Sequence, residues 1–204
     1  MSLKPVIRSL TDSLDGVPIH VSQLAELLRK HGRKQETNRD GVTDIDTFGH
    51  DVTTHGGNTK TTLWDPDTNR PIGEHGRITE IPEKTPRGDN ATAIGHLGDD
   101  GDHGGHLGAH RFFSDTPDTG IVPQAANLNL GAWKTMENEW GDWVSKGHYV
   151  DYEIDVYPPG AVRPDSFEVS YTVTDPTTGL ERTKMVSFDN VSGQTFDRVP
   201  SSAM

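Results

Sequence analysis

The densest group of residues that could do chemistry lies between positions 96 and 110. Histidines recur there among aspartates and glycines: His96, His103, His106 and His110. Histidine titrates near neutral pH and ligates metals, and glycine lets the backbone come close to a ligand. The stretch Asp102-His103-Gly104-Gly105-His106-Leu107 is therefore the first candidate for part of an active site.

Composition alone leaves three interpretations of this stretch open. A zinc site made from His103, His106 and His110 has workable spacing, but the run lacks the His-Glu-x-x-His order of zinc peptidases. A calcium loop built on the aspartates of 99–102 does not match the EF-hand pattern. The third interpretation is a solvated, glycine-rich loop without chemistry.

A second group of polar residues lies at the start of the clearest predicted helix, which runs from about Leu130 to Ser145. Large apolar side chains recur along it at helical spacing and predict a face packed toward a core: Trp133, Met136, Trp140, Trp143 and Val144. Asn129, Trp133 and Glu137 are four residues apart, so they fall roughly on one side of such a helix. Asn129 and Glu137 can therefore point at one spot near the helix start.

Four motifs, taken in order, resemble the DNA/RNA non-specific endonucleases. They are GGHLGAHRF at 104–112, VPQ at 122–124, NLNLGAW at 127–133 and ENEW at 137–140. The branch most similar to this chain is that of bacterial secreted and type VII toxin nucleases, and the likeness spans roughly residues 60–190. The resemblance implies an α+β fold, with a ββα-metal (His-Me finger) nuclease core on an antiparallel β-sheet.

The resemblance also implies roles for three residues. His106 matches the family's general base, Asn129 its direct metal ligand, and Glu137 the acidic residue that holds metal-bound water. The catalytic set is thus His106, Asn129 and Glu137, and the metal site is Asn129 with Glu137. The implied cofactor is a single Mg²⁺, with Mn²⁺ as a substitute, and the implied reaction is hydrolysis of phosphodiester bonds.

Substrate contacts are expected from residues around this set. Arg111 and Gln124 match family positions near the site, and Arg87 or Arg111 could bind a phosphate. The chain departs from the family at Gly104, where an arginine is usual, and at 112–114, where Phe-Gly-Gly is usual. These departures affect auxiliary phosphate contacts rather than the base or the metal ligand.

Charge and composition restrict the function classes. The formal net charge is −12, which argues against a broad basic surface for nucleic acid, so a nuclease needs a local cationic cleft. The absence of cysteine excludes disulfides, thiolate metal sites and a cysteine nucleophile. No apolar run approaches the roughly 18 residues of a membrane span, so no membrane partner is expected.

The expected partners and location follow from the resemblance. Nucleic acid is the substrate, and a cognate immunity protein is the expected partner of a bacterial toxin domain. The segment Met1–Pro5 lacks the apolar core of a signal peptide, so we expect secretion or delivery into a target cell by a non-classical route. Two other functions remain open: a catalytically silent nucleic-acid or protein-binding module on a nuclease scaffold, and a zinc-dependent hydrolase.

The chain divides into three predicted parts. Residues 1–58 hold a helix between Ser22 and Gly32 and a polar linker, 59–195 form the endonuclease domain, and 196–204 form a tail that frays after Gln194. A hairpin is predicted over 61–82, and residues 83–105 are polar and glycine-rich. Alternating apolar residues predict strands at 150–156 and 167–173, and a third strand at 184–188 completes an antiparallel meander.

Overall fold

The computed structural model describes residues 48–203, and the helix predicted between Ser22 and Gly32 lies outside the described residues. The strands are β1 (Gly49–His55), β2 (Asn58–Asp65), β3 (Arg70–Ile78), β4 (His103–His106), β5 (Ile121–Gln124), β6 (Tyr149–Tyr157), β7 (Ser166–Thr174) and β8 (Glu181–Asp189). The helices are α3 (Ala91–Gly95), α4 (His110–Phe113), α5 (Ala126–Leu128) and α6 (Lys134–Ser145). A π-helical turn, Asn129–Trp133, joins α5 to α6, and a 3-10 turn, Asp118–Gly120, precedes β5.

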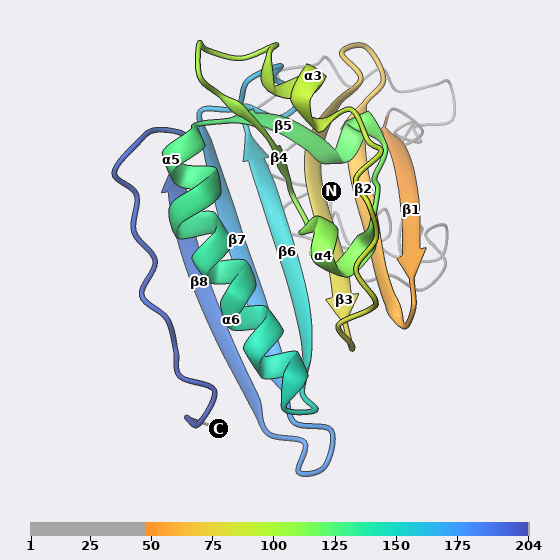
Figure 1. Cartoon of the computed structure of the whole chain (residues 1–204), viewed down its shortest axis with the longest axis vertical. Helices are drawn as coiled ribbons and strands as arrows, with labels where there is room; N and C mark the ends of the chain where they lie inside the picture. The colour runs from red at the N-terminus through yellow and green to blue at the C-terminus, as the bar shows by residue number, and fades with distance from the viewer. Residues whose placement is uncertain (1–47, 204) are drawn as a thin grey trace, which may run out of the picture. The chain divides into compact units, whose positions relative to one another are not determined.

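A six-stranded antiparallel sheet is the scaffold of the described chain (Figure 1). Its strand order is β1-β2-β3-β6-β7-β8, so each strand pairs with its neighbour in sequence except at the step from β3 to β6. Residues 79–148 are inserted at that step, and they carry α3, β4, α4, β5, α5 and α6. The hairpin over 61–82 and the meander of β6, β7 and β8 confirm the strands predicted from the alternating pattern.

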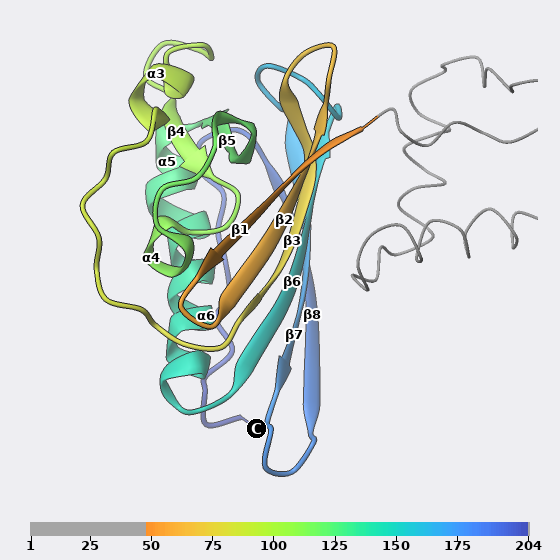
Figure 2. The same ribbon diagram turned by 90° about the vertical axis from the view of Figure 1, so that its right-hand side faces the viewer.

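The core lies between one face of the sheet and the helix α6 (Figure 2). The four large apolar residues of α6 and its preceding turn, Trp133, Met136, Trp140 and Trp143, are fully buried. Trp140 stacks on Tyr152 of β6, with ring centroids 5.0 Å apart, and Trp133 packs against Phe167 of β7. The aromatic face of the predicted helix is therefore confirmed as core, and it fixes the insert on the sheet.

The edge strand β1 falls in a range predicted to be a polar linker. It pairs with β2 in register from Gly49↔Trp64 to His55↔Asn58, and its one large aliphatic side chain, Val52, is 61% exposed. Backbone hydrogen bonds rather than apolar burial hold such an edge strand, so hydrophobic periodicity could not reveal it. The Gly56-Gly57 pair between two strands is the signal that could have done so. The predicted division of the chain at 58 stays untested, but its linker is wrong from Gly49 onward.

The tail after Gln194 is not frayed, contrary to the expectation. Phe196 and Val199 pack against the core, and the backbone N–H of Val199 donates to Glu139 Oε2 at 2.5 Å. Arg198 pairs with Asp142 on the exposed side of α6. Two apolar residues within a polar segment are too weak a pattern to predict docking, because the surface they cover is created only when α6 packs on the sheet.

No described helix is long and apolar enough to cross a membrane.

Candidate active site

Two short strands and the helix after them position the candidate residues. β4 and β5 pair antiparallel, with His103 opposite Gln124 and His106 opposite Ile121. β4 carries two glycines because its neighbours come very close: a Cβ on Gly104 would lie 1.8 Å from the carbonyl oxygen of Ala91 in α3. β5 leads directly into α5, so the succession is strand, strand, helix. Neither β4 nor α3 was predicted, since glycines and short turns carry no periodic signal.

A pocket of about 620 Å³ opens beside this unit. Four of the six predicted site residues line it: Arg87, Arg111, Asn129 and Glu137. The structure therefore brings together residues that lie up to 50 positions apart in the sequence. His106 and Gln124 are not among the lining residues, although the lining includes Gly104 and Ala109, which flank His106 in the chain.

The π-helical turn decides how Asn129 and Glu137 converge. Residues 126–145 are continuously helical, so the predicted helix exists but begins four residues earlier than expected. The hydroxyl of Thr135, in the first turn of α6, donates back to the carbonyl oxygen of Gly131 in the wide turn at 2.8 Å. Asn129 and Glu137 both line the pocket, while Trp133 between them is fully buried against the sheet. The expected polar pair is therefore formed, but Trp133 does not share its side.

The pocket is locally cationic in a chain of net charge −12. Arg87, Arg111 and Lys134 line it. The guanidinium of Arg111 lies 5.0 Å from the ring centroid of Phe112 and donates to Asn138 Oδ1 at 2.9 Å. It fits there because Gly141 has no side chain: a Cβ at that position would lie 2.5 Å from the guanidinium. The pocket thus supplies the local cationic cleft that a nuclease with an acidic surface requires.

Glu137 is the acidic counterpart of these cations. Burial raises the pKa of Glu137 from 4.5 to about 8, and the nearby Arg111 and Arg87 act in the opposite direction. A carboxyl whose pKa is raised to near neutral pH marks a site where a further positive charge would be favourable. Asn129 lies two helical turns before Glu137 and is half-buried. Its carboxamide makes no hydrogen bond to any residue in the part of the chain that the structure describes.

His106 is buried next to residues that line the pocket, and it is bonded to a residue outside the motifs. Its Nε2 is 2.7 Å from Oδ2 of Asp89, and the two side chains are 6% and 3% exposed. Burial lowers the pKa of His106 below 6.5, the bond to Asp89 raises it, and the charges of Lys60 and Arg87 lower it. The net direction is downward, so the imidazole is neutral at pH 7 and can accept a proton.

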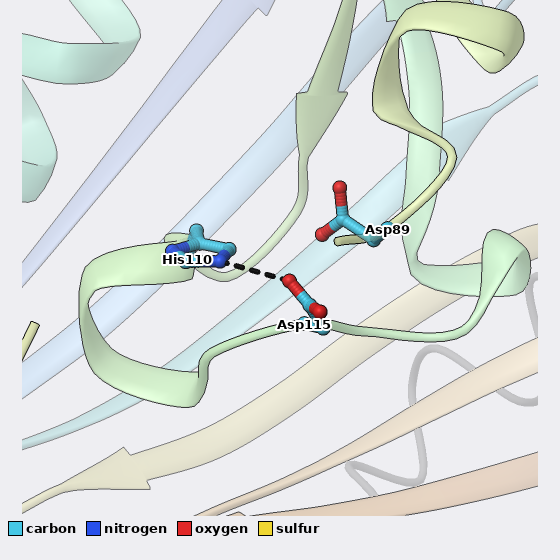
Figure 3. Close-up of side chains that lie close together, drawn as sticks. All are labelled: Asp89, His110 and Asp115. Atoms are coloured by element: carbon cyan, nitrogen blue, oxygen red, sulfur yellow. Dashed lines mark hydrogen bonds and ion pairs between the residues drawn. The ribbon is translucent and has the colours of Figure 1, made fainter. Parts of the chain in front are cut away.

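His110 is a second histidine at the site, and sequence reasoning gave it no role beyond the zinc set with His103 and His106. It lines the pocket, its ring stands edge-on to that of His106 with centroids 5.7 Å apart, and its Nε2 lies 3.1 Å from Asp115 Oδ1. Figure 3 shows His110, Asp115 and Asp89 together, and one donor atom of each lies within 4.8 Å of the others. Backbone N–H of Gly88 holds both oxygens of Asp115, which is 46% exposed.

The two metal sites considered as alternatives are not assembled. Among residues 48–203, the group of Asp89, His110 and Asp115 is the one set of three or more acidic or histidine side chains whose donor atoms could meet at an ion. The zinc set of His103, His106 and His110 and the calcium loop of 99–102 are therefore wrong as ligand sets. Asp102 instead pairs with Arg163, with Arg163 Nε 2.7 Å from Asp102 Oδ2, and so ties β4 to the β6–β7 connection.

Gln124 is buried rather than available in the pocket. It is 1% exposed, and its side-chain oxygen occupies the space that a Cβ on Gly105 would fill, at 2.2 Å. Neither its oxygen nor its nitrogen has a hydrogen-bond partner among the described residues. Its expected part in substrate binding stays a prediction, and in this position the side chain packs across the β4–β5 pair.

The loop of residues 79–90 supplies both Arg87 and Asp89. Side chains that follow in the insert hold this loop by hydrogen bonds at three positions: Ser114 at Thr85, Asp115 at Gly88 and Asp118 at Asn90. Sequence reasoning found Arg87 but not Asp89 or the loop's anchors, because no periodic pattern or motif marks them. The one available signal was their polar, charged character in a segment that precedes the histidine cluster.

A buried ion pair belongs to a polar cluster that packs against the chain between β4 and α4. Lys60 of β2 and Glu74 of β3 are both inaccessible, with Lys60 Nζ 3.0 Å from Glu74 Oε2. Thr62 and Tyr152 donate to the same carboxylate at 2.7 and 2.8 Å, so its oxygens are satisfied. A Cβ on Gly108 would lie 2.3 Å from the hydroxyl of Tyr152, which explains the glycine two residues after His106. The chain between β4 and α4 thus rests on a fully bonded polar cluster.

Two solved structures of NucA show the same fold. The chain is similar to NucA from Streptococcus agalactiae with a magnesium ion bound, at 13% identity and a TM-score of 0.51, over 90% of this chain and 93% of that one. The metal-free NucA gives 14% identity and a TM-score of 0.50, over 72% and 85% of the two chains. A protein described as an extracellular endonuclease matches at 16% identity and a TM-score of 0.48, over 83% and 92%.

The sequence of the chain also matches the model of a protein family. A search of curated proteins finds no match. The model of the DNA/RNA non-specific endonuclease family matches residues 69–175, which is more than half of the chain and includes the pocket with Arg87, Arg111, Asn129 and Glu137. The α+β fold expected from the motifs, with its strand–strand–helix unit on an antiparallel sheet, is confirmed. The chain therefore belongs to the DNA/RNA non-specific endonuclease family.

Proposed function

We propose that this protein hydrolyses phosphodiester bonds of DNA and RNA without sequence specificity, with one Mg²⁺ and His106 as general base. The observation that carries the proposal is the pocket that places Asn129 and Glu137 beside Arg87, Arg111 and Lys134. Its oxygen donors suit a hard divalent cation, and its cations suit the phosphates of a backbone. No base-reading surface is needed for such a substrate, which is consistent with cleavage independent of sequence.

The residues present fit a magnesium ion. Asn129 offers a carboxamide oxygen without a hydrogen bond to another described residue, and Glu137 offers a carboxyl whose raised pKa, about 8, a divalent cation would lower. Asn129 would hold the ion directly, and Glu137 would hold it through its water. When bound, Mg²⁺ supplies charge neutralisation at the phosphate and at the leaving oxygen. Mn²⁺ takes similar oxygen ligands and is the expected substitute.

The chain's own residues perform the remaining tasks. His106, neutral at pH 7, takes the proton of the attacking water. Arg87 and Arg111 bind phosphate oxygens on the pocket wall, and Arg111 is held ready by Asn138 and by the ring of Phe112.

Plasmid cleavage tests the proposal. Purified protein is incubated with supercoiled plasmid and Mg²⁺, with and without EDTA, beside His106→Ala, Asn129→Ala and, as a matched control, His50→Ala on the edge strand. Wild type and His50→Ala are expected to nick and linearise the plasmid, EDTA to stop them, and the two site variants to lose about 100-fold or more of the rate.

Each failure has its own meaning. Intact plasmid with wild type under Mg²⁺, Mn²⁺ and Zn²⁺ would favour the silent binding module. Activity recovered only with Zn²⁺ would favour a zinc hydrolase. Full activity of His106→Ala would remove the base assignment, and full activity of Asn129→Ala at low Mg²⁺ would remove the ligand assignment.

The proposed setting is that of an exported bacterial toxin domain restrained by an immunity protein. The support is the resemblance of the motifs to the toxin branch, together with a cationic pocket in an otherwise acidic chain that an acidic partner could cover. Inducible expression in a bacterial cytosol extends the plasmid test. Wild type is expected to arrest growth and degrade nucleic acid, and normal growth with soluble, active protein would exclude the toxin role.

A further inference from the structure

Asp89 is the residue at the site that no motif accounts for. It lies in the loop of residues 79–90, 17 positions before His106, and its side chain is 3% exposed. Carboxylates are rarely buried to this degree unless they are paired, because removal from water disfavours the charged form. Its one side-chain hydrogen-bond partner among the described residues is the imidazole of His106, with Nε2 and Oδ2 2.7 Å apart.

The loop around Asp89 is anchored on both sides. Backbone N–H of Gly88 donates to both carboxylate oxygens of Asp115, at 3.0 and 3.1 Å, and the side-chain amide of Asn90 donates to Asp118 at 3.0 Å. The carboxylate of Asp89 is therefore held between two fixed neighbours. These bonds fix the backbone on either side of Asp89 and so favour its position beside His106.

The pairing determines which nitrogen of His106 carries the proton. An ionised carboxylate only accepts hydrogen bonds, so Nε2 of His106 must donate to Asp89. A neutral imidazole has one N–H, which leaves the lone pair on Nδ1. We propose that Asp89 is a positioning residue, which holds His106 in the Nε2–H tautomer and so makes Nδ1 the atom that takes the proton from water. The inference rests on the proposed role of His106 as the base.

The charged and titratable groups around His106 come from three elements. Asp89 and Arg87 lie on the 79–90 loop, Lys60 lies on β2, and the ring of His110 stands edge-on from α4. Asp89 is the one that favours the protonated imidazole, while Lys60 and Arg87 disfavour it. Loss of the charge at 89 should therefore lower the pKa of His106 further and weaken it as a base.

Asp89→Asn is the test, because it keeps the size of the side chain and removes its charge. Cleavage of a double-stranded oligonucleotide under saturating Mg²⁺ is measured for the whole chain from pH 5 to pH 9. We expect kcat to fall about 10- to 1000-fold, as for removal of a carboxylate that orients a ligand or base histidine, with KM changed by less than about 3-fold. The acidic limb of the kcat profile should move to lower pH.

Asp118→Ala is the matched control, because it removes the other anchor of the same loop without touching His106. Its kcat and pH profile are expected to stay within about 3-fold of wild type. A kcat for Asp89→Asn within that range, or an equal fall in Asp118→Ala, would overturn the positioning role. Full activity of His106→Ala would instead remove the proposed function, so the two failures are distinguishable.

A measurement on the unaltered protein covers the case in which Asp89→Asn does not fold. Long-range ¹H–¹⁵N NMR of the histidine rings at pH 8 identifies the protonated nitrogen of each. A signal pattern for His106 with the proton on Nε2 is expected. A proton on Nδ1, or an equal mixture of the two tautomers, would overturn the proposal whatever the variants do.

Discussion

Individual side chains at this site work in pairs that set each other's charge. Burial alone would leave His106 a weak base, and Asp89 compensates in part for the loss of water. Glu137 shows the same competition with the signs reversed, since burial raises its pKa and Arg111 and Arg87 lower it. A neutral histidine and a carboxyl poised near neutrality are what the proposed reaction needs before substrate and cation arrive.

Glu153 carries the clearest pH-linked prediction at this scale. It lies on the face of β6 away from α6, and burial, with the charge of Asp155, raises its pKa from 4.5 to about 7. Between pH 4.5 and 7 the folded state keeps a proton that the unfolded state loses, so this group lowers the free energy of unfolding as pH rises through that window. Glu153→Gln should therefore stabilise the fold by about 1 kcal/mol at pH 8, after allowance for solvent screening.

Urea unfolding at pH 4.5 and at pH 8 checks this prediction. The gain of Glu153→Gln over wild type should be present at pH 8 and absent at pH 4.5. Glu181→Gln, on the exposed start of β8, is the control and should change stability at neither pH. An equal gain at both pH values would show that packing, rather than ionisation, accounts for the effect.

At the scale of elements, the π-helical turn is the feature on which the site depends. An α-helix turns by about 100° per residue, so a regular helix through 126–145 would point Asn129 and the apolar residues before it in other directions. The wide turn absorbs one residue and lets Leu128 stay fully buried while Asn129 faces the pocket. Such turns recur at functional sites in other proteins, and this one directs Asn129 toward the pocket.

Insertion of one alanine after Gly131 tests that role. The added residue should rotate Asn129 by about 100° relative to Glu137. We expect plasmid cleavage to fall at least 100-fold in a variant that still unfolds cooperatively. Gly131→Ala is the control: a Cβ there meets nothing within 4 Å, so activity should be kept and the helix stabilised by up to about 1 kcal/mol. Cleavage retained by the insertion variant would contradict the geometric role.

At the scale of the whole molecule, charge is divided between surface and pocket. The chain has 31 acidic and 19 basic residues, yet Arg87, Arg111 and Lys134 meet in one cavity. The outward face of β6 carries Asp151 and Asp155, on the side of the sheet away from α6. Nucleic acid is therefore expected to bind at the pocket alone and to be repelled elsewhere, which favours release of the product.

The salt dependence of DNA binding measures the number of phosphates that the protein neutralises. With three cations at the site, the slope of log K against log[salt] for double-stranded DNA should be about −3. The measurement uses Asn129→Ala, which is expected to bind without cleaving, in EDTA and increasing NaCl. Lys134→Ala in the same background should make the slope shallower by about one. A slope steeper than about −6 would indicate a broad basic surface and contradict the confined site.

The sequence by itself determined the strongly periodic elements and the chemistry of the motif residues. Alternation predicted β6, β7 and the β2–β3 hairpin, and helical spacing predicted α6, since burial on one face forces these periods on any chain. The motif residues Asn129, Glu137 and Arg111 were identified from their resemblance to the family, and all three line the pocket. Residue type and order along the chain are local properties, which a sequence displays directly.

Only the tertiary structure decided which residues surround them. Asp89 meets His106 across 17 positions, Lys60 meets Glu74 beneath them, and Gln124 turns into the packing instead of the pocket. β1, β4 and the docked tail at Phe196 also went unpredicted, because their stability comes from partners supplied by the rest of the fold. Contacts between distant segments depend on how the sheet and the insert pack together. No local pattern of residues along the chain shows that packing.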